Sequence, residues 1–417
     1  MADQFEQYKK QLTESVYASL DFALDTSDAE MYALIDEKIS ALCETRGLAL
    51  DVRRKLRRDV FSSIRELDVL QPLLDDPRVT EIMVNGPDEI FVERGGRLSR
   101  HTETFSSAEK LADVVQQIVA GCNRVVNEAS PIVDARLPGS GARVNCVLSP
   151  IALNGPILTI RRFPEKPITM KGLIAFGALP QELHRYLSVL VKAGCNIFIS
   201  GGTGSGKTTF LNALSDSVPK DERVITIEDN AELQIRHIPN LVRMEARNAN
   251  VEGCREITIR DLIKSSLRMR PDRIIVGEVR GSEAIDMIQA MNTGHDGSMS
   301  TGHANSTRDM LSRLETMILM GMELPLQAVR RQIASAIDVI VHLSRMRDKS
   351  RKLVEICEVT GVVDPVTGEV ETSPLFRFRE TGQDASGNIT GIWEKCNEFQ
   401  NMEKIRAAGL ALPVYAG

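Results

Sequence analysis

The first 70 residues place apolar side chains at helical spacing. Stretches of this kind cover residues 5–24, 28–47 and 51–70; the second ends at Gly47 and the third stops before Pro72. Apolar residues that recur every three or four positions are typical of helices that bury one face, and Gly and Pro are common just beyond a helix end. The pattern predicts a small N-terminal helical bundle over residues 1–70.

Between residues 71 and 163 the pattern changes to short alternating stretches. Strands are predicted at 80–85, 89–94 and 97–101, and a helix at 107–122 is followed by further strands within 134–152 and 155–163. We therefore predict a mixed α+β domain over 71–163. The next segment, 164–180, contains three prolines and two glycines without periodicity, and is predicted to be a linker.

Residues 181–417 alternate helical stretches with short apolar strands. The strands are predicted at 196–200, 223–229, 272–278 and 338–343, and the tail returns to strands before a short helix near 402–408. This alternation predicts an α/β fold, with a parallel sheet that has helices on both faces.

Composition narrows the class of protein. Of 417 residues, 42% are hydrophobic and 26% charged, which is ordinary for a globular protein. A net charge of −6 gives no indication of nucleic-acid binding. The seven cysteines are scattered without CxxC spacing, which favours reduced thiols in a cytosol and argues against a zinc site. The N-terminus lacks the apolar core of a signal peptide, so we expect a soluble chain.

The clearest chemical signal follows the strand at 196–200. The segment Gly201 to Thr208 reads GGTGSGKT and leads into a helix-forming run. In this context G-x-x-x-x-G-K-T predicts a phosphate-binding loop, because its glycines let backbone N–H groups turn towards phosphate oxygens. Lys207 is predicted to reach the β- and γ-phosphates of a nucleotide, and the Thr208 hydroxyl to bind Mg²⁺.

Acidic residues follow two of the predicted strands. Glu278 comes after 274–276, and Glu228, Asp229 and Glu232 come after 224–227. A carboxylate at the tip of a strand beside a bound nucleotide holds the metal or orients water. Each acid alone would suit a helix cap or a solvated loop, whereas the cluster indicates hydrolysis.

Two of the six histidines, His295 and His303, lie in the segment GHDGSMSTGHANS at 294–306. No Cys or His stands beside them at zinc spacing. If the segment returns to the sheet edge where the γ-phosphate lies, an imidazole there can donate a hydrogen bond to phosphate or to attacking water. Phosphate sensing, an ordinary polar loop and, least favoured, a metal site remain open from these residues.

Four segments carry a family resemblance: 81–96, 201–209, 226–233 and 268–306. Together they resemble the ATPases of the type II/type IV secretion superfamily, most closely the assembly ATPase of tight-adherence (Flp-type) pili. The resemblance runs from about residue 68 to the C-terminus. It implies a RecA-like P-loop ATPase domain (181–417), preceded by a small α+β (PAS-like) domain, the linker and the N-terminal bundle. It also implies a cytoplasmic homo-hexamer, peripheral at the inner membrane, that binds ATP and Mg²⁺ and docks on inner-membrane pilus platform proteins.

The resemblance also implies roles for individual residues. The Walker A loop would comprise Gly201, Gly202, Thr203, Gly204, Ser205, Gly206, Lys207, Thr208 and Thr209. Glu228, Asp229 and Glu232 would form the acidic box with metal and catalytic carboxylates, Glu278 would be the Walker B carboxylate, and His295 and His303 would form the histidine box. Arginines before the linker reach the γ-phosphate in such enzymes. Arg136 and Arg143 are favoured here over Arg161 and Arg162, because they flank a glycine-rich turn.

Two features depart from the family pattern. Similar sequences carry an apolar residue just before the second histidine, where this chain has Gly302, which loosens the backbone there. The four-cysteine zinc insert of some relatives is missing, so no zinc is expected. The basic run Arg53 to Arg58 fits a solvated helix face better than a docking site for acidic partners or lipid.

The sequence therefore predicts a motor that hydrolyses ATP and drives pilus assembly, with retraction as a further option. An effector-secretion or conjugation ATPase of the same superfamily would have the same chemistry and another cargo. A nucleic-acid translocase would need a basic channel, which the acidic total does not favour. A scaffold that binds nucleotide without hydrolysing it is disfavoured by the intact carboxylates.

Overall fold

The chain divides into two compact units. The computed structural model describes residues 2–20, 27–122, 124–162, 167–247, 255–385 and 387–415. The first unit comprises residues 1–164, and the second comprises nearly all of the chain from residue 165 onward. Among the described residues, no helix combines the length and apolar character needed to cross a membrane.

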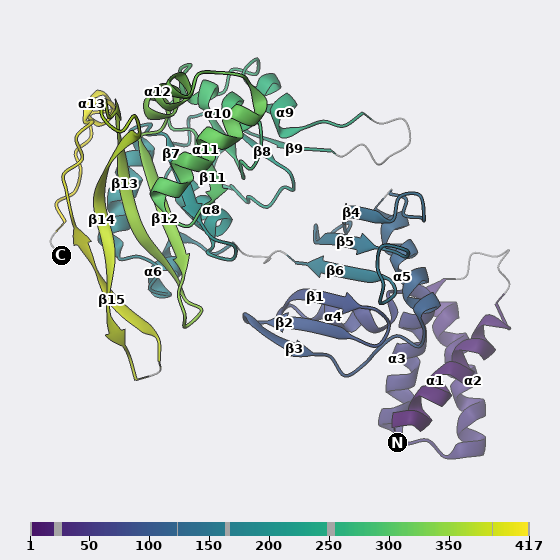
Figure 1. Ribbon diagram of the computed structural model, residues 1–417. Helices are drawn as coiled ribbons and strands as arrows, with labels where there is room; N and C mark the ends of the chain where they lie inside the picture. The colour runs from purple at the N-terminus through teal and green to yellow at the C-terminus, as the bar shows by residue number, and fades with distance from the viewer. Residues whose placement is uncertain are drawn as a thin grey trace. The chain divides into compact units, whose positions relative to one another are not determined.

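The N-terminal helices of the first unit are α1 (Ala2–Tyr17), α2 (Asp28–Arg46) and α3 (Leu50–Arg65), drawn in purple in Figure 1. They share a core that includes Leu12, Ile35 and Leu56. The helix α2 begins with a capping box at Ser27 and ends on Gly47 in the left-handed conformation. Residues 21–24 of the first predicted helix lie outside the described residues.

The third helix ends earlier than the sequence indicated. After Arg65 the chain makes a 3₁₀ turn, η1 (Asp68–Leu70), and then a separate short helix, α4 (Gln71–Asp75), whose first turn contains Pro72. Asp68 has a φ of 50°, a left-handed conformation that a continuous helix does not allow. Its carboxylate pairs with Lys9 at 2.9 Å.

The basic run on α3 is largely engaged within the first unit. Arg57 pairs with Asp36 at 2.6 Å, Lys55 pairs with Glu103 at 3.0 Å, and Arg53 donates to the carbonyl of Leu48 at 2.8 Å. These partners fit the interpretation of this run as a solvated helix face.

An antiparallel sheet completes the first unit, in the order β3-β2-β1-β6-β5-β4. Its strands are β1 (Val79–Asn85), β2 (Ile90–Arg94), β3 (Arg97–Arg100), β4 (Ile132–Arg136), β5 (Arg143–Val147) and β6 (Ile157–Arg161). Helix α5 (Ala108–Gly121) buries Leu111, Val115 and Ile118 in the core that this sheet shares. The predicted strands and helix of the 71–163 region are present.

The second unit is built on a nine-stranded sheet in the order β15-β14-β13-β12-β7-β11-β10-β8-β9. The parallel part comprises β7 (Ile197–Gly201), β8 (Val224–Glu228), β9 (Leu241–Glu245), β10 (Arg273–Val276), β11 (Met299–His303) and β12 (Val339–Arg345). Antiparallel strands β13 (Arg351–Val363), β14 (Val370–Gln383) and β15 (Ile389–Lys395) extend it on one side (Figure 1).

Helices pack against this sheet in two separate hydrophobic cores. The alternation of helices and strands in the sequence predicted such packing on both faces. One core contains side chains of α6 (Met170–Ala175), α7 (Gln181–Lys192), α8 (Lys207–Ser215) and α13 (Glu403–Ala407). The other contains side chains of α9 (Ile259–Ser266), α10 (Ala284–Met291), α11 (Thr307–Gly321) and α12 (Leu326–Ala336). Within β7, Ile197 and Ile199 belong to the first core and Phe198 to the second, which follows from the alternation of side chains along a strand.

The segment 164–180, expected to be a linker, contains α6. Met170 is buried in the first of these cores, together with Ala178 and Leu179. The chain has therefore joined the second unit by Met170, because these apolar side chains find a buried place there.

Candidate functional site

The glycine-rich loop leaves the central strand β7 and enters α8, whose first residue is Lys207. Gly204 and Gly206 have φ values of 71° and 92°, which glycine adopts without strain. At Gly201 a Cβ would lie 2.4 Å from the carbonyl oxygen of Leu343, so no larger residue fits there. The Ser205 hydroxyl is buried and has no hydrogen-bond partner in the described part of the chain. This narrow turn at a helix N-terminus fits an anion such as phosphate.

The ammonium group of Lys207 lies inside this turn. Its Nζ donates to the carbonyls of Gly201 at 3.0 Å and Gly202 at 3.1 Å. Burial lowers the pKa of Lys207, and the negative charge of Glu278 opposes that effect. The lysine is therefore held by neutral carbonyl oxygens, which an anionic phosphate would outcompete.

His303 lies beside the loop because β11 pairs with β7 and sets His303 opposite Gly201. Its Nδ1 is 3.2 Å from Nζ of Lys207, and its Nε2 is 3.0 Å from Oε1 of Glu278. An ammonium only donates and a carboxylate only accepts. His303 is therefore a neutral imidazole: its Nδ1 accepts a hydrogen bond from Lys207, and its Nε2 donates one to Glu278. Burial, and then the charge of Lys207, lower the pKa of His303, in agreement with the neutral form.

Gly302 does not loosen this part of β11. It pairs with Ser200 inside the sheet, and a Cβ there would lie 2.9 Å from Sδ and Cε of Met310 and from Cε1 of Phe198. These two side chains occupy the space that an apolar residue at 302 would need. The backbone that carries His303 is thus fixed by strand pairing and by packing.

The acidic residues occupy neighbouring positions because β8 and β10 are adjacent and parallel. Glu278 follows β10, and its side chain is 32% exposed, so it is accessible from solvent. Asp229 pairs with Arg280, which joins the segments that follow these two strands.

Glu228, at the end of β8, is buried and shapes the loop behind it. Its Oε1 accepts hydrogen bonds from the backbone N–H groups of Glu232 and Leu233, each at 2.9 Å. Burial raises the pKa of the Glu228 carboxyl to about 7. Gly277 leaves room for it, since a Cβ there would lie 2.8 Å from its Cγ. Glu228 therefore fixes the backbone that carries Glu232.

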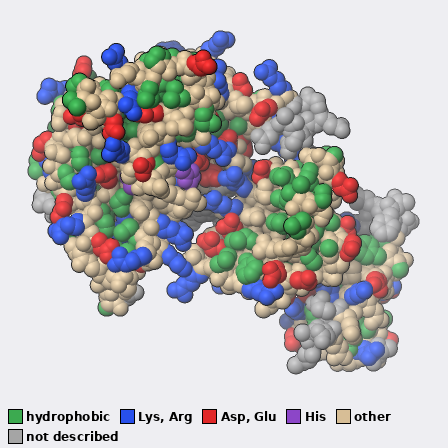
Figure 2. Space-filling model, viewed as in Figure 1, with side chains coloured by type: hydrophobic (Ala, Val, Ile, Leu, Met, Phe, Trp, Pro, Cys, Tyr) green, Lys and Arg blue, Asp and Glu red, His purple; other side chains and the backbone are tan. Residues whose placement is uncertain are grey.

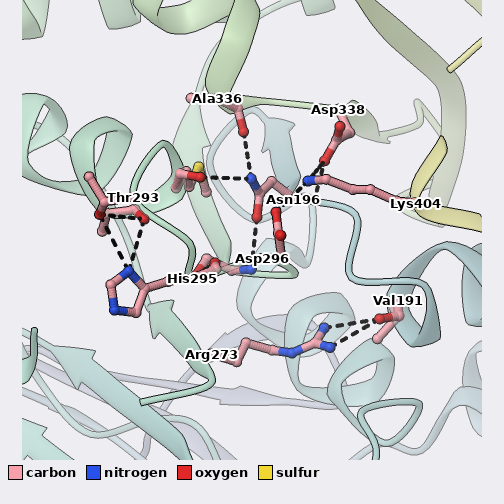
Figure 3. A network of polar contacts seen from close by, with 12 residues as sticks. Val191, Asn196, Arg273, Thr293, His295, Asp296, Ala336, Asp338 and Lys404 are labelled. Atoms are coloured by element: carbon pink, nitrogen blue, oxygen red, sulfur yellow. Dashed lines mark hydrogen bonds and ion pairs between the residues drawn. The ribbon is translucent and has the colours of Figure 1, made fainter. Parts of the chain in front are cut away.

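His295 is separated from this cluster. It precedes β11, whereas His303 ends it, and a strand of this length spans about 13 Å. Its Nδ1 lies 3.2 Å from the carbonyl of Ala290 and 3.4 Å from the Thr293 hydroxyl (Figure 3). The structure therefore does not bring the two predicted histidines together.

The segment around His295, just before β11, makes contacts with other parts of the second unit. Lys404 of α13 contacts Asp296 and Asp338, each at 2.7 Å, and Asp338 also accepts from the backbone N–H of Asn196 at 2.7 Å (Figure 3). Gly297 packs against the buried Arg273, where a Cβ would lie 2.5 Å from Cζ. Packing therefore accounts for the glycine at position 297.

Arg136 and Arg143 face each other across the β4–β5 hairpin of the first unit, and both are half-buried. They flank the glycine-containing turn, as the sequence indicated. Arg162 donates to the carbonyl of Asp76 at 2.5 Å, and Arg161 is exposed at the end of β6.

The sequence did not single out two arginines that lie beside the glycine-rich loop. Arg351 Nε donates to the carbonyl of Gly204 at 3.3 Å, and a Cβ at Gly204 would lie 3.7 Å from Nη1 of Arg345. On the face of the second unit drawn in Figure 2, histidine atoms lie among lysine and arginine side chains. The basic segment RMRDKSR at 345–351 was the sequence feature that could have indicated these arginines.

Comparisons with known proteins give consistent results. Residues 64–394 match the family described as "Type II/IV secretion system protein". A putative conjugal transfer protein of Mycobacterium tuberculosis is 38% identical over 307 residues, which cover 72% of this chain and 87% of that protein. The type IV secretion system protein VirB11 of Brucella suis is 34% identical, over 66% of this chain and 84% of its own. The Yersinia pseudotuberculosis ATPase DotB has a similar fold, with a TM-score of 0.50 and 17% identity, over 71% of this chain and 78% of its own.

Proposed function

Because the chain belongs to the type II/IV secretion system protein family, we propose that it is a motor that hydrolyses ATP to ADP and phosphate. The observation that carries this proposal is the position of His303 between Lys207 and Glu278, at the mouth of the glycine-rich loop. A cation, a neutral imidazole and a carboxylate meet there beside an anion cradle, which suits the cleavage of a bound polyphosphate.

The loop amides and Lys207 bind the phosphates. Lys207 leaves the carbonyls of Gly201 and Gly202 for the more strongly attracting phosphate oxygens. Thr208 and Glu278 would hold Mg²⁺, which neutralises charge on the phosphates when bound. Glu278 or Glu232 accepts the proton of the attacking water, because a carboxylate near the γ-phosphate takes up that proton as the bond forms.

His303 links the phosphate site to the carboxylate. When Lys207 turns towards phosphate, Nδ1 of His303 loses its donor while Nε2 stays within hydrogen-bond distance of Glu278. The imidazole is then able to reorient towards the γ-phosphate or its attacking water. His303 thereby reports whether a phosphate is present.

The working form is a homo-hexamer at the cytoplasmic side of the inner membrane, docked on platform proteins. Arg136 and Arg143 neutralise charge that develops on the γ-phosphate during hydrolysis. The support for this part is family membership together with the opposed placement of these arginines on one hairpin.

We assign the motor to assembly of a tight-adherence (Flp-type) pilus, on the motif resemblance of 201–209, 226–233 and 268–306. Conjugation is the second candidate, and the conjugal transfer proteins among the relatives favour it. The two candidates share their chemistry and differ in cargo.

Lys207→Ala tests the chemistry. We expect phosphate release to fall by at least about a hundredfold, because the lysine stabilises charge that grows in the transition state. Lys220→Ala, at an exposed lysine beyond the C-terminal end of α8, is the matched control and should leave the rate unchanged. A Lys207→Ala protein that turns over ATP within a few-fold of wild type would refute the proposal.

Complementation of a deletion strain tests the cargo. Wild type, but not Lys207→Ala, should restore pili counted by electron microscopy. If the two proteins instead differ only in the frequency of DNA transfer between cells, the pilus assignment is wrong and conjugation is the cargo process.

A further inference from the structure

The hairpin between β12 and β13 brings two arginines over the glycine-rich loop. Strand β12 runs parallel to β7, with Leu343 opposite Gly201, so the strand continues past the start of the loop (Figure 1). Arg345 ends β12 and Arg351 begins β13. The two are directly paired across the hairpin, which places both side chains on one face, with Cβ atoms about 5 Å apart.

The Arg351 side chain contacts the loop, and the Arg345 side chain lies beside it. Arg351 Nε donates to the carbonyl of Gly204 at 3.3 Å, and its Cγ lies 3.8 Å from the position of a Cβ at Gly206. Arg345 Nη1 lies 3.7 Å from the position of a Cβ at Gly204. Both arginines are exposed, so a ligand in the loop reaches them from solvent.

This pair is electrostatically unfavourable as it stands. Like charges directly opposite each other destabilise a strand pair. Within the described ranges, no ion pair joins Arg345 or Arg351 to a carboxylate. Arg347, in the same turn, pairs with Glu380, and Arg377 and Arg379 on β14 pair with Glu355 and Glu394. Arg347 thus has a carboxylate partner, whereas the two arginines beside the loop have none among the described residues.

We propose that Arg345 and Arg351 bind the phosphate groups of the nucleotide in the same chain and so complete the anion site from the β12–β13 hairpin. This inference rests on the proposed function, in which the loop binds ATP. A guanidinium presents several N–H donors in a planar fork that matches phosphate oxygens. A polyphosphate between the two arginines supplies the negative charge that relieves their repulsion, so the arginines tighten both ATP and ADP binding.

The test compares single alanine variants of the hairpin. With Mg²⁺ present, Arg345→Ala and Arg351→Ala should each raise the Kd of ATP and of ADP about tenfold, the usual effect of losing one charge-assisted hydrogen bond. Arg347→Ala is the matched control in the same turn and should bind as wild type does. Arg351→Lys, which keeps the charge and loses the fork, should fall between wild type and Arg351→Ala.

Thermal unfolding without nucleotide separates binding from a structural role. Removal of one of two repelling charges should leave the unfolding temperature unchanged or raise it. Loss of a structural contact would lower the unfolding temperature. The inference is overturned if Arg345→Ala and Arg351→Ala bind ATP and ADP as Arg347→Ala does, or if weaker binding appears only with a lowered unfolding temperature. If Lys207→Ala also hydrolyses ATP normally, the proposed function fails as well; if only the arginine variants behave normally, the failure concerns the hairpin alone.

Discussion

His303 donates from Nε2 to the Glu278 carboxylate over 3.0 Å, and this contact joins the ends of two adjacent parallel strands. The donation requires the neutral tautomer, because Nδ1 faces an ammonium. The Glu278 carboxylate is thus hydrogen-bonded to a histidine that also contacts Lys207. The relationship makes the chemistry of the loop depend on three neighbouring strands, β7, β11 and β10.

The two candidate bases should differ in their dependence on magnesium. Glu278→Gln and Glu232→Gln should each bind ATP with little change and hydrolyse it at least about a hundredfold more slowly, because an amide keeps the shape and cannot accept a proton. Glu278→Gln should also need more Mg²⁺ for half-maximal rate, since Glu278 lies at the Lys207 cluster. Phosphate release measured across a magnesium titration provides both values.

Glu371→Gln, at an exposed site on β14, controls for the substitution itself and should hydrolyse ATP normally. Normal turnover in both Glu278→Gln and Glu232→Gln would remove carboxylate catalysis from the mechanism.

Much of the second unit was predictable from the sequence. Strands β7, β8, β10 and β12 are almost entirely buried apolar runs, which read directly as core strands. Strand β9 was missed because its burial is partial and its sequence, LVRME, has no continuous apolar run. Strand β11, MSTGH, was not among the predicted strands, because small residues replace apolar ones where Met310 and Phe198 fill the space.

The site was predictable only where a motif carried it. The glycine loop and the carboxylates after strands follow from local sequence. The separation of His295 from His303 depends on β11 lying between them, and the contact of Lys404 with Asp296 depends on where the chain returns near its end. The hairpin arginines reach the loop through the β12–β7 pairing, which local patterns do not encode.

Glu228 should make folding stability depend on pH. Its pKa is raised by burial from 4.5 to about 7 in the folded protein, so the folded state binds the proton more tightly than the unfolded state does. The stability associated with this group is therefore present below about pH 4.5 and is lost as pH rises to about 7. At about 1.4 kcal/mol per pKa unit, the full loss is roughly 3 kcal/mol.

Glu228→Gln should abolish that loss, because a glutamine accepts the same two backbone hydrogen bonds without ionising. Denaturant unfolding between about pH 4 and about pH 8, a range that brackets the titration, measures the difference between variant and wild type. Glu403→Gln, at an exposed glutamate, should follow the wild-type curve. Parallel curves for Glu228→Gln and wild type would show that the carboxyl is ionised in the folded protein.

Gly302→Ala should disturb the packing that fixes His303. The added Cβ meets Met310 and Phe198 at 2.9 Å, so a side chain or β11 must shift. Overpacking of this kind destabilises by about 1–3 kcal/mol, and a displaced His303 should lower turnover as well. Met310→Ala in the same chain makes room for the new methyl group. The loss of stability in the double variant should then be smaller than the sum of the losses in the two single variants. A double-mutant cycle measures this difference. Additive effects would mean that these positions do not compete for space.

His303 should control the acid limb of the pH profile. Protonation turns Nδ1 from an acceptor into a donor and adds a positive charge beside Lys207, so the charged imidazole can no longer take its place in the site. Because burial lowers the pKa of His303 below its ordinary 6.5, turnover should persist at pH 6.5 and fall only at more acidic pH. His303→Gln, which both accepts and donates without titrating, should turn over more slowly and lose this limb. Rates measured between about pH 5 and about pH 8, a range that spans the ordinary imidazole pKa by more than about one unit on each side, provide the comparison.

The two histidines give the sharpest contrast, because one segment carries both. His303→Ala should lower the rate of ATP hydrolysis by about ten- to a hundredfold while ADP affinity stays nearly unchanged, since ADP lacks the phosphate being sensed. His295→Ala removes a side chain whose Nδ1, within the described part of the chain, contacts the Ala290 carbonyl and the Thr293 hydroxyl before the start of β11. The substitution should therefore lower the unfolding temperature slightly and leave the rate of the folded protein intact. Equal losses of rate in the two variants would mean that His295 reaches a nucleotide by another route, across a subunit boundary. An unchanged rate in His303→Ala would mean that the segment has only a structural role, which the packing of Gly297 and the ion pair of Asp296 would account for.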